Sequence, residues 1–161
     1  MKKNDMLILA DTRQQKDSHI IKYFDKENIK WLRCGLESAD YMALRYDEDK
    51  GIYKDYTTLI DTKKDLLELC GNLCHTSEHQ RVVHEIELGQ SLGCSNFIFL
   101  IAKNKIKTIE DVKSWSNPNT QVTGDTLLKV MATFKAHHNV RFVIVPKKMM
   151  GKKIIELLNE L

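Results

Sequence analysis

Hydrophobic and polar residues alternate along the chain with two periods, one typical of strands and one typical of helices. Short apolar runs of strand length lie at residues 6–10, 29–33, 96–102 and 140–145. Apolar residues three or four positions apart predict helices at residues 18–27, 64–74, 80–92 and 123–134 and a closing helix around 154–161. The stretch TIED, residues 108–111, matches a capping box and predicts a short helix at 108–115. Strands and helices are therefore mixed along the whole chain.

Two further strand candidates, residues 41–47 and 53–62, flank the turn-like stretch DEDKG. They predict a β-hairpin that turns at Lys50 and Gly51. A hairpin early in the chain and βα-type units later predict an α/β fold, with a mixed β-sheet flanked by helices.

The open end of this hairpin carries the residues that suggest chemistry. A turn at the predicted position places Asp40 opposite Asp61, and directly opposed residues have Cβ atoms roughly 4.5–5.5 Å apart. Alternation along the strand puts Lys63 on the same face as Asp61. Two carboxylates at that separation can share Mg²⁺, which prefers oxygen ligands and usually takes one or two protein carboxylates. The trio predicts metal-assisted hydrolysis of a phosphodiester, and a surface ion pair is the alternative.

Composition limits the classes of protein to which the chain can belong. Its 161 residues, 42% hydrophobic and 29% charged, predict one globular domain over residues 1–161 and exclude collagenous, disordered and membrane-spanning classes. The net charge of +3 does not by itself indicate a nucleic-acid partner. Two local groups of lysines could lie near phosphates or form a solvated basic face, Lys147, Lys148, Lys152 and Lys153 in one and Lys103, Lys105 and Lys107 in the other.

The first apolar run is too short for a signal peptide, so we expect a cytoplasmic protein with reduced cysteines and no association with a membrane. The stretch CGNLCHTSEHQRVVH has cysteines and histidines, but their intervals do not match a common zinc motif. Buried cysteines are the simpler interpretation.

Three stretches together resemble the nuclease domain of XPF-type structure-specific endonucleases, within the PD-(D/E)XK superfamily. ILADTRQQ resembles a strand that ends in Asp-x-Arg-Glu, LESADY resembles Gly-Asp-Tyr, and LIDTKKDL resembles Glu-Arg-Lys followed by a helix. The order and intervals agree, and the likeness covers most of residues 6–161. The chain is similar to a small stand-alone member, as in a phage or a bacterium.

The resemblance implies a restriction-endonuclease-like core that cleaves branched, flapped or forked DNA in repair or recombination with Mg²⁺ or Mn²⁺, and that forms a homodimer. The implied catalytic residues are Asp11, Asp40, Asp61 and Lys63, and the three aspartates are the implied metal ligands. The implied substrate-binding residues are Arg13, Arg81 and Lys64, and Glu85 is placed to pair with Arg81 four residues away.

Three positions depart from the family pattern. Gln14 stands where the family has Glu, Ala39 where it has Gly, and Thr62 where it has Arg. The alternative function is therefore a catalytically impaired relative that binds DNA or a partner nuclease as a scaffold without cleaving.

Overall fold

The computed structural model describes residues 6–47, 49, 51–103 and 105–160. The strands are β1 (Met6–Asp11), β2 (Trp31–Cys34), β3 (Tyr41–Asp47), β4 (Gly51–Lys63), β5 (Asn96–Lys103) and β6 (Val140–Pro146). The helices are α1 (Ser18–Lys26), α2 (Leu66–Cys74), α3 (Thr76–Ser91), α4 (Gly124–His138) and α5 (Met150–Asn159), with short 3₁₀ segments η2 (Glu110–Ser114) and η3 (Lys147–Met149). Within the described residues, no helix is long and apolar enough to cross a membrane.

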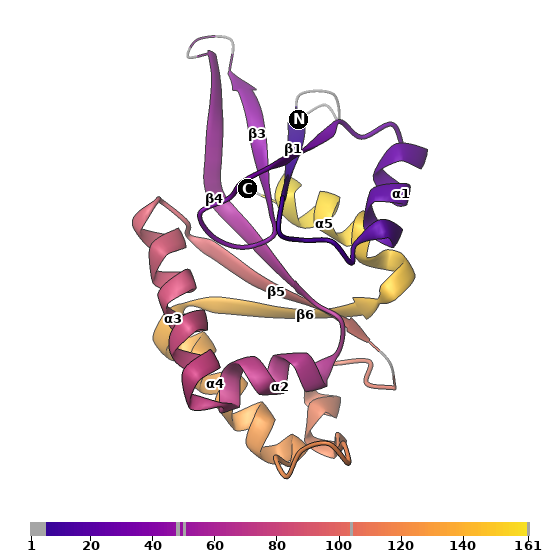
Figure 1. The fold of residues 1–161 in the computed structure, drawn as a ribbon, viewed down its shortest axis with the longest axis vertical. Helices are drawn as coiled ribbons and strands as arrows, with labels where there is room; N and C mark the ends of the chain where they lie inside the picture. Colours follow the sequence, from indigo (N-terminus) through magenta and orange to yellow (C-terminus); the bar gives the residue numbers. More distant parts are fainter. Residues whose placement is uncertain (1–5, 48, 50, 104, 161) are drawn as a thin grey trace.

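The strands form one mixed sheet in the order β2-β1-β3-β4-β5-β6, which confirms the predicted fold class (Figure 1). β1 runs parallel to β2, and β4, β5 and β6 run parallel to one another, whereas β3 is antiparallel to both β1 and β4. The carboxyl ends of β1 and β4 therefore lie at the same edge of the sheet. In α/β sheets this edge is where ligands usually bind.

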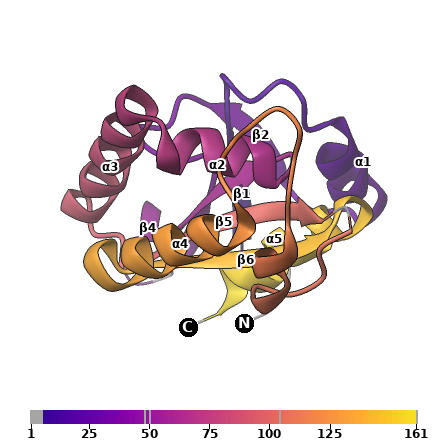
Figure 2. The same cartoon turned by 90° about the horizontal axis from the view of Figure 1, so that it is seen from below.

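Helices cover both faces of the sheet (Figure 2), and each face has its own apolar core. Leu9, Met42 and Leu59 point toward α2, α3 and α4. Their neighbours Ile8 and Ile60 point to the opposite face, toward α1 and α5. This alternation is the period of two that the sequence shows in each strand.

Most predicted elements are confirmed, with shifted boundaries. Helix α3 begins at Thr76 instead of residue 80. The capping box before η2 is confirmed, because Thr108 Oγ1 accepts from Asp111 N at 3.3 Å and Asp111 Oδ2 accepts from Thr108 N at 3.2 Å. Leu161, predicted to be buried by the closing helix, lies outside the described residues.

The predicted position of the hairpin turn was wrong. Asp47 pairs with Gly51, so the turn lies between these residues and not at Lys50 and Gly51. Glu48 and Lys50 themselves lie outside the described residues.

A bulge in β4 corrects the register before the strands reach the open end of the hairpin. Ala43 pairs with Asp55, but two residues earlier in β3 Tyr41 already pairs with Ile60, so β4 has extra residues between the two pairs. The pairing of Tyr41 with Ile60 is the one that the predicted turn required. The two predicted metal ligands next to this pair are therefore neighbours, as expected.

Asp17 anchors the loop that joins β1 to α1, a role that the sequence analysis missed. Its carboxylate is 2% exposed. Arg33 donates through Nη1 and Nη2 to its two oxygens at 2.9 and 2.8 Å, and Tyr41 Oη donates to Oδ2 at 2.6 Å. The side chain thereby connects the loop to both β2 and β3.

We expect Asp17→Asn to lower the free energy of unfolding by about 2 kcal/mol, because it leaves Arg33 without its buried partner. Urea unfolding at pH 7 measures this change. Asp125→Asn, which breaks an exposed pair with Lys129 on α4, is the matched control and should change stability by less than about 0.5 kcal/mol.

The stability difference between the wild-type chain and Asp17→Asn depends on pH. Burial raises the pKa of Asp17, but the hydrogen bonds from Arg33 and Tyr41 outweigh burial and leave the pKa below its ordinary value. Ionised Asp17 therefore stabilises the fold above about pH 4 and loses this effect as the pH falls through its lowered pKa. The difference between the wild-type chain and Asp17→Asn should shrink below about pH 4. A difference that grows on acidification contradicts this assignment.

Candidate active site

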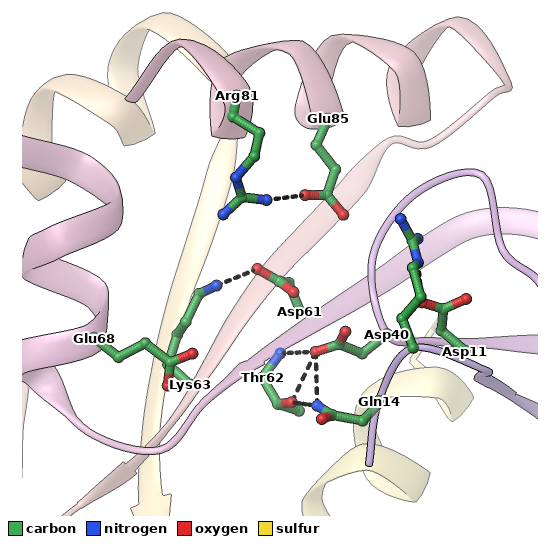
Figure 3. A pocket seen from close by; sticks show the side chains of 10 residues that line it. Asp11, Gln14, Asp40, Asp61, Thr62, Lys63, Glu68, Arg81 and Glu85 are labelled. Atoms are coloured by element: carbon green, nitrogen blue, oxygen red, sulfur yellow. Dashed lines mark hydrogen bonds and ion pairs between the residues drawn. The ribbon is translucent and has the colours of Figure 1, made fainter. Parts of the chain in front are cut away.

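Three aspartates lie side by side at the edge of the sheet because backbone hydrogen bonds align them. Asp11 N donates to Asp40 O at 2.8 Å, and Asp40 N donates to Ile60 O at 3.0 Å, next to Asp61. The aspartates belong to β1, the residue before β3, and β4. They line a cavity of about 270 Å³, shown from close by in Figure 3.

Asp40 is fixed in place by donors on one of its oxygens. Its Oδ2 accepts from Thr62 N and Thr62 Oγ1, both at 2.8 Å, and from Gln14 Nε2 at 3.2 Å. Gln14 Nε2 also donates to Thr62 Oγ1 at 2.7 Å. Two of the three departures from the family pattern, Gln14 and Thr62, are therefore in contact with each other and both hold Asp40.

The proximity of Asp40 and Asp61 is electrostatically unfavourable in the absence of a cation. Burial raises the pKa of Asp40 well above its ordinary value, and the negative charge of Asp61 raises it further, despite the opposing bonds from Thr62. Two carboxylates held together in a partly buried cavity are oxygen ligands of the kind that Mg²⁺ and Mn²⁺ prefer. The donor set of this pair therefore fits a divalent cation.

Lys63 stands beside this pair, as the alternation of β4 predicts. Its Nζ lies 2.9 Å from Asp61 Oδ2, and both residues are 7% exposed. Burial lowers the pKa of Lys63, but the charge of Asp61 and the hydrogen bond to it outweigh burial and raise the pKa overall. Lys63 is therefore a buried, permanently charged ammonium group at neutral pH.

Asp11 lies in the same cavity but has its own partners. Its Oδ2 accepts from Arg13 Nε at 2.7 Å, and its Oδ1 accepts from Leu36 N at 3.0 Å. The side chain of Arg13 is 68% exposed, so its guanidinium lies at the mouth of the cavity. In the part of the chain that the structure describes, no three His, Cys, Asp or Glu side chains are grouped closely enough to hold a metal. The pair Asp40 and Asp61 is therefore the candidate ligand set, with Asp11 beside it.

Helix α3 closes the cavity from above, in the view of Figure 3. Arg81 Nη1 lies 3.5 Å from Glu85 Oε2, which confirms the predicted pair, and Arg81 Nη2 lies 2.9 Å from Glu78 Oε2. Burial and the charge of Asp61 raise the pKa of Glu85. Glu85 was predicted only as a partner of Arg81, but it also lines the cavity.

Glu85 also contacts Ala39, the third position that departs from the family pattern. Its Oε1 accepts from Ala39 N at 2.9 Å. Ala39 has a φ of 63°, in the left-handed region that glycine adopts most readily. The conformation of the residue before Asp40 thus explains why the family pattern has glycine there, and the bond to Glu85 helps to hold alanine in it.

Lys64 does not line this cavity, although it was predicted to bind substrate. Its side chain is exposed at the end of β4 and lines a second hollow on the other side of Thr62. The backbone N of Lys64 donates to Glu68 Oε2 at 2.8 Å, and Glu68 lines both hollows. Lys63 lines both hollows, whereas Lys64 lines the second one.

We expect Asp40→Asn to stabilise the metal-free protein by about 1 kcal/mol at pH 7, because it removes the repulsion from Asp61. A raised carboxyl pKa means that the folded state keeps a proton which the unfolded state has lost above about pH 4. Stability therefore falls as the pH rises from about 4 toward the raised pKa, and the substitution removes this loss. Urea unfolding in a chelator, from about pH 4 to 7, measures the difference. An unchanged difference across that range contradicts the repulsion.

Comparisons with known proteins agree with this geometry. The model of the ERCC4 domain matches residues 10–157. Two solved structures of XPF from Aeropyrum pernix, the second in complex with DNA, have TM-scores of 0.62 and 0.63 and sequence identities of 10% and 11%. Each match covers 94% of this chain and 64% or 62% of the solved chain, so this chain spans less than two thirds of their length. No significant match was found among curated proteins. The matched region contains the aspartates, Lys63 and the strands that align them, and the chain belongs to the ERCC4 domain family of XPF-type nuclease domains.

Proposed function

We propose that the chain is a metal-dependent endonuclease that hydrolyses phosphodiester bonds in branched, flapped or forked DNA. The pair of Asp40 and Asp61 beside Lys63 carries the proposal. Burial and mutual repulsion disfavour two ionised carboxylates at this place, and the raised pKa of Asp40 reflects that cost. A divalent cation between them relieves the repulsion, so the arrangement suits cation binding better than structural support.

Asp40 and Asp61 would hold Mg²⁺ or Mn²⁺, together with Asp11, which lines the same cavity. When bound, the ion supplies a water of lowered pKa and stabilises the negative charge that develops on phosphorus. Gln14 and Thr62 would orient Asp40 for this role, because their donors fix its Oδ2 in place.

The cationic residues have different tasks in this proposal. Lys63 lies within the cavity, where its ammonium group can orient the attacking water or neutralise the pentavalent phosphorus. Arg13, exposed at the mouth, can bind the phosphate that is cleaved. Arg81 is held by two glutamates on α3 and faces the same cavity, so it can contact a neighbouring phosphate.

DNA as the substrate is supported by membership of the ERCC4 domain family and by the related XPF structure in complex with DNA. The proposal has four further parts. The chain prefers branched DNA, acts in repair or recombination, forms a homodimer, and acts in the cytoplasm of a bacterial or phage-infected cell. These parts rest on the resemblance to XPF-type nucleases.

We expect Asp61→Asn and Lys63→Gln each to lower the rate of cleavage at least about 10²-fold, because the first removes a proposed metal ligand and the second removes the proposed positive charge beside the reacting phosphate. Labelled flap, fork and four-way substrates with Mn²⁺ provide the assay. The matched controls are Asp125→Asn and Lys129→Gln, which make the same chemical changes in the exposed pair on α4 and should keep the wild-type rate.

The same assay decides between cleavage and a scaffold role. A scaffold binds the substrates without cutting them, and its binding does not change in the two site variants. Cleavage that survives both site variants also contradicts the proposed roles of these residues. A chain with neither cleavage nor salt-dependent DNA affinity is not a nucleic-acid-binding protein.

A further inference from the structure

We propose that a second, basic hollow beside the carboxylate cavity binds phosphate groups of the nucleic-acid strand next to the cleaved bond. The basic hollow is defined by Lys16, His19, Lys64 and Lys147 and has a volume of about 470 Å³. The inference rests on the proposed function, since it assigns the path of the substrate away from the same site.

The two hollows are adjacent. Gln14, Thr62, Lys63 and Glu68 line both of them, so the side chains that hold Asp40 form the partition between the two spaces. A nucleic-acid strand with a phosphate at Asp40 and Asp61 has neighbouring phosphates on either side. The basic hollow is the space that one of these neighbours would enter.

The hollow has an excess of positive charge. Lys16, Lys64 and Lys147 are exposed, and none of them forms an ion pair with a residue in the described ranges. Two acids line it: Asp17 is already bound by Arg33 and Tyr41, and Glu68, which accepts from Lys64 N, is outnumbered by the three lysines. These positive charges therefore remain available for a ligand.

The three lysines come from separate parts of the chain. Lys16 belongs to the loop between β1 and α1, Lys64 to the junction of β4 with α2, and Lys147 to η3. They meet because the carboxyl ends of β1, β4 and β6 lie at the same edge of the sheet. This convergence differs from a run of lysines along one exposed helix face, which needs no ligand.

His19 adds a polar atom without a partner. Its Nε2 is enclosed and makes no hydrogen bond within the described part of the chain. Burial lowers the pKa of His19, and the positive charge of Lys147 lowers it further. The charge of Lys147 is therefore felt inside the hollow, at the imidazole. A phosphate there would be attracted by Lys147 and could satisfy the imidazole, whose unmet hydrogen bond otherwise costs stability.

The test compares two double variants with the same change in charge. Lys16→Ala/Lys147→Ala removes two lysines of the hollow. Lys30→Ala/Lys135→Ala removes two exposed lysines at the opposite edge of the sheet, before β2 and near the end of α4. Binding of labelled single-stranded, duplex and flap DNA is measured by fluorescence anisotropy in a chelator, over a series of salt concentrations. Urea unfolding checks that both variants fold.

We expect the hollow variant to bind about tenfold more weakly than the control variant at low salt. The slope of log affinity against log salt should fall by about 1.4 if the two lysines contact a single strand and by about 1.8 if they contact a duplex. The substrate whose slope changes identifies which form enters the hollow. Equal affinity and equal slope in the two variants overturn the proposal.

Failure of this inference can be told apart from failure of the proposed nuclease activity. If the wild-type chain cleaves DNA but the hollow variant binds like the control, the hollow has no role and the nuclease proposal stands. If the wild-type chain does not cleave but the hollow variant loses affinity, the nuclease proposal fails and the basic hollow remains a nucleic-acid site.

Discussion

The backbone hydrogen bonds that join the ends of β1, β3 and β4 determine the character of the site. Asp11 N to Asp40 O and Asp40 N to Ile60 O are bonds of the sheet itself, so the aspartates cannot separate unless the sheet breaks. The proximity of Asp40 and Asp61 is thus imposed by the fold. Such preorganisation, in which folding energy holds two carboxylates near each other, is what the proposed cation site requires.

Gln14 and Thr62 show how a chain can depart from its family pattern and keep this arrangement. The pattern has an acid at the first position and a guanidinium at the second, which can pair with each other. Here an amide and a hydroxyl make a neutral pair, with Nε2 and Oγ1 2.7 Å apart, and both donate to Asp40. The two departures are neighbours in space, so they are best understood as one joint change. An acid at position 14 alone would bring a third negative charge to Asp40 and lose a donor.

The sequence predicted the fold and the proximity of Asp61 to Lys63 because both depend on local patterns. The apolar alternation of β1, β4 and β5 sets which face each residue occupies, and the spacing of Asp61 and Lys63 follows from it. The pairing of Asp40 with Asp61 was predicted from a turn that the structure does not have, and a bulge in β4 supplies the missing shift. Contacts between distant residues, such as Asp17 with Arg33 and Glu85 with Ala39, leave no periodic signal, and they were missed.

The electrostatics of the whole edge follow from the same topology. The carboxyl ends of the parallel strands bring acids into one hollow and unpaired lysines into the next, with Gln14 and Thr62 between them. A polyanion that carries its own divalent counterions is complementary to such a surface, whereas a neutral ligand would leave both charge excesses unsatisfied.

The central claim is that Asp40 and Asp61 form one cation site, and an anomalous-scattering map of a crystal soaked in Mn²⁺ tests it most directly. The expected result is a manganese peak between the two carboxylates, with the ammonium of Lys63 alongside. Carboxylates turned away from each other, with no peak between them at a saturating manganese concentration, would contradict it.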